Sequence, residues 1–214
     1  MKKIISLVLA GVMALSLVAC GNDKPAETTP VETTTPVETT VPVETTAPEA
    51  ETQAPVASTG ALAVLETIWN LYAEDEKFAV IGGNMENPVD GAPGNYDMAY
   101  AENLPWNLLV PETELANIDE AATMIHMMNA NTFTCGVVHL VEGTDAEAFA
   151  NTMRDAIQGN QWMCGFPETL TVAVLGGGYV LIAFGVNDAM NPFMAHFNEA
   201  YGNPTMLINE AVEG

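Results

Sequence analysis

A low-complexity segment near the N-terminus limits how much of this chain can fold. From Gly21 to Thr59 the sequence is rich in Pro, Thr and Glu, and Pro-Val-Glu-Thr-Thr recurs at Pro30, Pro36 and Pro42. This composition offers too little apolar surface to offset the entropy cost of folding, so we expect a disordered or polyproline-like stalk. Of the 214 residues, those from residue 60 onward remain for a core, which is enough for one domain.

Residues 1–19 have the parts of an export signal. Lys2 and Lys3 precede an apolar run that ends in Leu-Val-Ala directly before Cys20. The run is shorter than the roughly 20 apolar residues that a membrane-spanning helix needs. The segment resembles the signal of bacterial lipoproteins, and by that resemblance Cys20 carries acyl chains such as palmitate. More than one chain gives stable anchoring to the membrane.

The resemblance and the composition together predict three parts of the chain, and the resemblance predicts its location. Residues 1–19 are the signal peptide, residues 20–59 are the linker, and residues 60–214 are a single domain. We expect the protein to lie at the cell membrane, lipid-anchored and facing outside the cytoplasm. Its linker threonines are candidates for glycosylation, which the composition does not decide.

The charge of the domain excludes several classes of partner. Seven of the 28 acidic residues precede Gly60, which leaves 21 against Lys77 and Arg154, a formal charge of −19. Nucleic acid is excluded as a direct ligand, because neutralising phosphates requires clustered Lys and Arg. Anionic lipid surfaces and phosphorylated substrates are disfavoured for the same reason. A charged partner should therefore be cationic, although an acidic surface also simply keeps a protein soluble.

The residue types that the domain lacks argue against catalysis. The chain has serine only at Ser6, Ser16 and Ser58, so the domain has no serine nucleophile. Lys77 lies in a charged run that indicates a solvated helix end rather than a nucleophile. The sequence contains no glycine-rich phosphate loop, no dinucleotide fingerprint and no His-Glu-x-x-His motif. We therefore expect neither an enzyme nor a bound cofactor.

The first half of the domain predicts helices and one long loop. Apolar residues recur at three- and four-residue steps over residues 61–76, which predicts a helix. Six Gly and Pro residues between Ile81 and Asp97 predict a long surface loop. Two short helices should follow, one stopped by Pro105 and one opened by Pro111.

The second half predicts two pairs of strands and two helices. Alternating apolar residues favour strands over 122–128 and 133–141, although a helix from Ile118 is the alternative for the first. Thr144 and Glu147 form a capping box for a helix that stops at Gly159. The remaining elements are strands over 170–175 and 179–184 around three glycines, and a helix over 192–201. The fold class is thus α+β, with an antiparallel sheet of about four strands in ββαββα order and helices packed on one face.

The domain also resembles a family of small, uncharacterised bacterial lipoproteins. The likeness lies in Met127–Asn129, in the strand and helix from Cys135 to Ile157, and in Gly178–Leu181. It covers about half of the domain and implies a fold but no site.

Cys135 and Cys164 are the only cysteines after Cys20. An exported protein lies where a disulfide persists, so a Cys135–Cys164 bridge is possible. The alternative is two buried free thiols. A cysteine nucleophile would need a neighbouring His, and no recognisable signature surrounds either residue.

Two groups of residues suit metal ions. Met124, His126 and Met128 share one face of the first strand, and Cys135 should lie opposite His126, giving soft ligands that suit copper(I). Core packing is the alternative, because Met commonly fills gaps in cores. The loop Gly82–Asp97 is rich in Asn and Asp, the oxygen ligands that calcium prefers, but its spacing does not match a calcium loop.

The anchor, the linker and the lack of a catalytic set together favour one function. We expect a membrane-anchored extracytoplasmic lipoprotein whose domain is a non-catalytic module that binds or supports an unknown protein partner. The alternative is a lipoprotein that binds a small ligand or a metal ion, calcium or copper.

Overall fold

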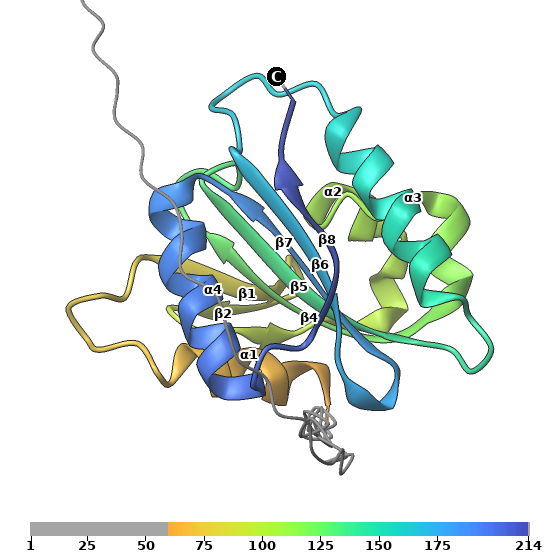
Figure 1. Ribbon diagram of the computed structural model, residues 1–214, viewed down its shortest axis with the longest axis horizontal. Coiled ribbons are helices and arrows are strands. Elements are labelled where there is room, and N and C mark those ends of the chain that lie inside the picture. The colour runs from red at the N-terminus through yellow and green to blue at the C-terminus, as the bar shows by residue number, and fades with distance from the viewer. Residues whose placement is uncertain (1–59, 214) are drawn as a thin grey trace, which may run out of the picture. The chain divides into compact units, whose positions relative to one another are not determined.

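The structure of this protein is a computed structural model, which describes residues 60–213. The predicted signal peptide, linker and lipid site at Cys20 lie outside the described residues. The domain combines helices with one antiparallel sheet (Figure 1). Its elements in chain order are α1 (Ala61–Trp69), β1 (Val80–Asn84), β2 (Asn87–Asp90), β3 (Gly94–Asn95), the 3₁₀ helix η1 (Met98–Asn103), α2 (Leu104–Asn107), η2 (Glu112–Asn117), β4 (Ile118–His126), β5 (Phe133–Leu140), α3 (Ala146–Gln158), β6 (Thr169–Val174), η3 (Gly176–Gly178), β7 (Tyr179–Gly185), α4 (Asn187–Tyr201) and β8 (Thr205–Ala211).

The sheet has eight strands, so the expected four were an undercount. Its order is β2-β1-β4-β5-β7-β6-β8, and β3 also pairs with β4. The four predicted strands are β4 to β7, in the centre. The other four were missed because β1 to β3 come from the glycine- and proline-rich stretch that was expected to be a loop, and β8 follows the last predicted helix.

Helices cover both faces of the sheet, which corrects the expectation of one covered face. The central strands are apolar on both sides, as β5 and β7 show with nearly every side chain buried. Both faces must therefore be removed from water. On one face α1 and α4 pack around Phe133, Phe193 and Phe197. On the other face α2 and α3 pack around Leu108, Phe149 and Ile182.

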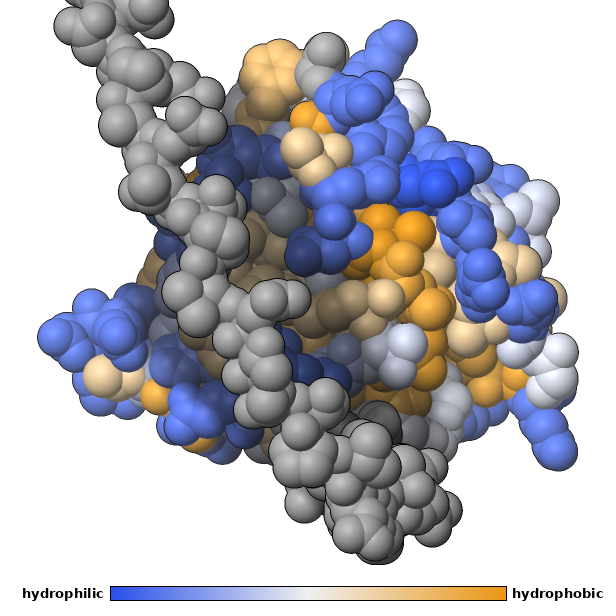
Figure 2. Space-filling view, in the orientation of Figure 1, coloured by the Kyte–Doolittle hydropathy of each residue, from blue (hydrophilic) through white to orange (hydrophobic). Residues whose placement is uncertain are grey.

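The sheet is only partly covered near β8. Figure 2 shows apolar surface in the middle of this view, around β8 and towards α3, with hydrophilic side chains around it. Several side chains of β6 and β8 are only partly buried there, among them Val174, Leu207 and Ile208.

Two strands share the outer edge of β4. β1 pairs with the end of β4, with Gly82 opposite Met124. β3 pairs with the adjacent residues of the same edge of β4, with Gly94 opposite Thr123. The two backbones pass so closely that a Cβ atom on Gly82 would lie 2.1 Å from the Gly94 nitrogen. Glycine is therefore required at this crossing.

The β4–β5 hairpin is shifted by two residues from the predicted register. Cys135 lies opposite Met124, not opposite His126. The turn is longer than expected because β4 ends at His126, whose Nδ1 accepts the backbone N–H groups of Met128 and Asn129 at 3.3 and 3.2 Å. A shift of two keeps every side chain on its predicted face.

The two long helices were predicted well, apart from their first residues. Asp145 caps α3, accepting the N–H groups of Glu147 and Ala148 at 3.0 and 3.1 Å, so the expected Thr144 capping box is wrong. α4 begins at Asn187, before Pro192, and ends as predicted at Gly202 in the left-handed conformation. α1 ends at Trp69, earlier than the predicted residue 76. Within residues 60–213, no helix has the length and apolarity needed to span a membrane.

Candidate interaction surface

One end of the sheet gathers several loops. The β4–β5 turn (residues 127–132) lies against the segment that follows α3, because Asn129 Nδ2 donates to the Cys164 carbonyl at 2.6 Å. Asn131 Nδ2 donates to the Gly165 carbonyl at 2.9 Å. The β4–β5 turn is also tied to the α1–β1 connection, since Met127 N–H donates to the Ala79 carbonyl at 2.9 Å.

A groove of about 210 Å³ runs between these loops and α2. Its aromatic wall is made of Trp106, Trp162 and Phe184, and its polar groups are uncharged. Trp162 packs on Phe184 with ring centroids 5.7 Å apart, and its buried Nε1–H finds no hydrogen-bond partner within residues 60–213. The groove is lined by Trp106, Asn107, Leu109, Ala130, Asn131, Thr134, Asn160, Trp162 and Phe184.

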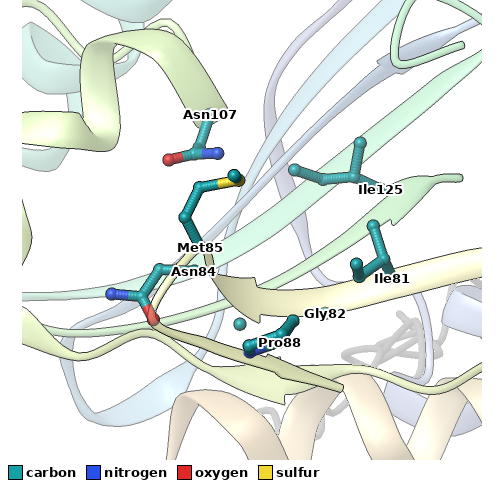
Figure 3. Close-up of a pocket in the computed structure, with 8 residues that line it drawn as sticks. Ile81, Gly82, Asn84, Met85, Pro88, Asn107 and Ile125 are labelled. Atoms are coloured by element: carbon teal, nitrogen blue, oxygen red, sulfur yellow. The ribbon is translucent and has the colours of Figure 1, made fainter. Parts of the chain in front are cut away.

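A second cavity, of about 190 Å³, lies beside the β1–β2 hairpin. Its walls are mostly apolar, and Figure 3 shows Ile81 and Ile125 on one side with Met85 directed towards Asn107. The buried side chain of Asn84 accepts the Asn87 N–H through Oδ1 at 3.0 Å, and its Nδ2 has no partner among the described residues. The cavity thus has mostly apolar walls, and the buried Asn84 nitrogen points away from Ile81 and Ile125 in Figure 3.

Asn107 lines both hollows and joins them. Its Oδ1 accepts the hydroxyl of the buried Tyr96 at 2.8 Å, which leaves its Nδ2 free to donate elsewhere. Burial, together with the charges of Glu86 and Glu102, raises the pKa of Tyr96 to about 12. The hydroxyl therefore remains a donor at neutral pH and holds the Asn107 amide in one orientation.

Large apolar side chains project into solvent from the β4–β5 turn, from the segment after α3, from α2 and from the β1–β2 turn. Trp106 is 87% exposed, Met128 is 82% exposed and Met163 is 88% exposed. Exposures this high are unusual for such residues when they come from neighbouring segments, and they mark interaction sites. We call this group the distal apolar patch; its members are Met85, Trp106, Met127, Met128, Met163 and Phe166.

Two carboxylates lie near the Met85 side of the patch, those of Glu86 and Glu102. Glu86 follows Met85 in the β1–β2 turn, and both Glu86 and Glu102 act on Tyr96 below the cavity. The two basic residues of the domain are each held by a carboxylate. Lys77 Nζ lies 2.7 Å from Glu74, and Arg154 lies 2.7 Å from Asp155.

The two cysteines do not form the bridge that their number allowed. Both thiols are free: Cys135 is buried in the centre of the sheet, and Cys164 is exposed on the loop after α3. Burial raises the pKa of the Cys135 thiol well above its ordinary value. A thiol that is both buried and protonated is a poor nucleophile, so Cys135 acts as a small core residue.

The proposed copper face is not assembled. Met124 and Cys135 are fully buried between the sheet and the α1–α4 layer, whereas Met128 lies in the turn beyond the end of β4 and points to solvent. His126 stacks on Phe78 at 5.9 Å, and its Nδ1 already accepts two backbone amides. These four residues therefore serve the core, the turn and the surface separately.

The segment Gly82–Asp97, predicted to be a surface loop and considered for calcium, instead contains most of β1 and all of β2 and β3. Asn84 is buried at the end of β1, and Asn87 and Asp90 belong to β2. Among residues 60–213, no group of three or more His, Cys, Asp or Glu side chains is placed to hold a metal ion.

A polar cluster at the opposite end of the sheet was not predicted. His139 Nδ1 and Asp119 Oδ1 are 2.5 Å apart, and the His139 ring packs on Tyr179. Glu120 accepts the Ala61 N–H at 2.7 Å and the Tyr179 hydroxyl at 3.0 Å. This cluster fixes the start of α1 against the sheet.

Sequence reasoning singled out Met128 only as a candidate copper ligand and predicted no apolar patch. Trp106, Met163 and Phe166 lie in segments without periodicity, so no apolar face was expected there. The available signal was the presence of large apolar residues in segments rich in Gly, Asn and Pro. Comparison with protein families, with curated proteins and with solved structures found no match for the chain.

Proposed function

We propose that this protein is a lipid-anchored extracytoplasmic lipoprotein whose domain binds a protein partner without catalysing a reaction. The N-terminal sequence supports the anchor, because a charged start, an apolar run and Leu-Val-Ala-Cys precede the linker. One structural observation supports binding: large apolar side chains are exposed on the β4–β5 turn, on the segment after α3 that this turn contacts, and on α2 across the adjoining groove.

The position of this end suits a tethered binding module. The chain enters the described domain at Gly60, beside Glu120 near the start of β4. Met127 and Met128 of the distal apolar patch directly follow the far end of β4, about 25 Å away at 3.3 Å per residue. Figure 1 shows the same arrangement, with the start of α1 at the bottom of the view and the cyan segment after α3 at the top. A partner can therefore reach the patch while the other end leads to the anchor.

Two experiments on intact cells test the proposal. Labelling with a palmitate analogue should mark the wild-type protein and not Cys20→Ala, which should leave the membrane fraction. A photo-reactive amino acid placed at Met128 should then crosslink the anchored protein to another protein. Membrane localisation unchanged by Cys20→Ala would refute the anchor, and a lack of protein crosslinks from any exposed position would refute the binding role.

A second candidate function is binding of a small neutral ligand. The observation in its favour is the apolar cavity beside Met85, which has the amide side chains of Asn84 and Asn107 among its lining residues. Its volume of about 190 Å³ is below that of a typical drug site, so the ligand would be small. A panel of small apolar amides should raise the melting temperature of the wild type, and Ile125→Trp, which fills the cavity, should abolish that shift.

A further inference from the structure

Resting on the proposed protein-binding function, we infer that the distal apolar patch is the docking site and that its partner is a cationic segment carrying apolar side chains. The patch supplies the contact area, and the charge of the domain selects the partner. Three other occupants fit the same apolar surface in principle: a second copy of the chain, the N-terminal part of the same chain, and a lipid surface.

The side chains of the patch suit a peptide rather than a rigid surface. Met85, Met128 and Met163 are long, unbranched and more than four-fifths exposed. Methionine adapts to partners of different shape, which makes it common on surfaces that accept amphipathic helices. Trp106 adds a large flat ring at the mouth of the adjoining groove. Trp is also the residue type most often found at the energetic centre of an interface.

The groove provides a hydrogen-bond donor for the backbone and the polar side chains of the partner. Asn107 presents its Nδ2 between the two hollows because Tyr96 holds its Oδ1. Trp162 contributes its ring to the groove wall, while its Nε1–H is buried and has no partner within residues 60–213. The Asn107 Nδ2 group is a donor, so the complementary group of the partner is an acceptor such as a backbone carbonyl.

Charge complementarity decides among the occupants. The domain has a formal charge of −19, and its two cations are already paired with Glu74 and Asp155. A second copy would bring an equal negative charge. Residues 21–59 carry seven acidic residues and one lysine, so they too are repelled. Anionic lipid is repelled likewise, whereas a basic segment is attracted and gains an apolar contact.

Binding is tested with defined probes on the chain from residue 20 onward carrying Cys20→Ser, which keeps it free of lipid. The probe is a fluorescent amphipathic helix of Leu and Lys, compared with a Ser/Lys peptide and a Leu/Glu peptide. The Leu/Lys peptide should bind best, and raising the salt concentration should weaken it. The triple variant Trp106→Ser, Met128→Ser, Met163→Ser should weaken binding about tenfold or more.

Val141→Ser is the matched control, because Val141 is 39% exposed and its N–H bonds the Asn117 carbonyl at the opposite end of β5. It should leave peptide binding within about twofold. Equal binding of the Ser/Lys peptide, or a triple variant that binds as the wild type does, would overturn the inference. Dimers in sedimentation experiments that the triple variant abolishes would assign the patch to a second copy and overturn it as well.

Crosslinking on cells separates this inference from the proposed function. A protein crosslink from position 128 to a basic segment, and none from position 141, is the expected result. Crosslinks to a protein from position 141 alone would leave the binding role standing and refute the patch as its site. Crosslinks from position 128 to lipid or to residues 21–59 would refute the cationic partner.

Discussion

Gly82→Ala should be among the most damaging single-methyl substitutions in this domain. The added Cβ would lie 2.1 Å from the Gly94 nitrogen, 2.4 Å from the Pro93 carbonyl carbon and 2.6 Å from the Ala92 oxygen. These are backbone atoms of the segment that forms β3, so they cannot move aside as a side-chain tip can. Ordinary contact needs about 3.4 Å or more, so β3 must shift by more than 1 Å.

The energetic cost follows from the contacts that such a shift breaks. Overpacking alone costs about 1–3 kcal/mol. Displacing β3 also removes its pairing with β4 and the adjoining hydrogen bond from Tyr96 N–H to the Ala121 carbonyl, at about 1 kcal/mol for each bond. We expect a loss of about 3–5 kcal/mol in the free energy of unfolding. At about 2–4 °C per kcal/mol, the melting temperature should fall by roughly 10 °C.

Gly91→Ala is the control, because it replaces a glycine directly after the β1–β2 hairpin at a position where the added methyl group meets no other atom. Gly91 has φ of 73° and no atom within 4 Å of the place that an added methyl group would take, so it should cost only the left-handed backbone penalty of about 1–2 kcal/mol. Urea unfolding, followed by circular dichroism, measures both variants. If Gly82→Ala costs no more than Gly91→Ala, the close crossing of β1 and β3 is wrong.

Three further predictions concern a cap, a tyrosine and the thiols. Asp145→Ala should lower the free energy of unfolding by about 1 kcal/mol in urea titrations, and Thr144→Ala should not, since Asp145 is the N-cap; equal losses would restore the capping box. The tyrosine hydroxyl has a pKa near 10 in the unfolded chain and about 12 at Tyr96 in the folded domain, so the free energy of unfolding should fall as the pH rises across this interval. Tyr96→Phe should reduce the dependence of the melting temperature on pH in the same interval. An unchanged slope would contradict the raised pKa. In native Cys20→Ser protein a thiol reagent should modify Cys164 and reach Cys135 only on unfolding; a native protein with no reactive thiol would indicate a disulfide.

The centre of the fold was predictable because its signals are local. The alternation of β4 to β7, the three glycines before Tyr179 and the left-handed Gly202 each specify an element within a few residues. Both covered faces were implied by the same residues: β5 is buried at almost every position, which one layer of helices cannot achieve. The expectation of a single helical face overlooked this pattern.

The edge of the sheet was not predictable from local pattern. Gly82 and Gly94 indicate a loop when each is considered within its own segment. The need for glycine at these positions becomes clear only in the fold, where β1 and β3 pass too close to each other for a Cβ atom. The register of β4 and β5 likewise depends on His126 accepting two turn amides, a contact that no periodicity encodes. The candidate site was missed for the same cause, because Trp106 and Met163 become neighbours of one surface only through tertiary contacts.

The placement of Gly60 and the distal apolar patch at opposite ends of β4 has a mechanical consequence. A pull applied between the anchor and a bound partner runs along β4 and β5, so the paired positions of these strands share the load in shear rather than breaking one after another. α1 is loaded in the same direction, against the layer formed by β4 and β5. The domain should therefore unfold at a higher force when pulled between residues 60 and 128 than when pulled across the sheet, between β2 and β8 at its two edges.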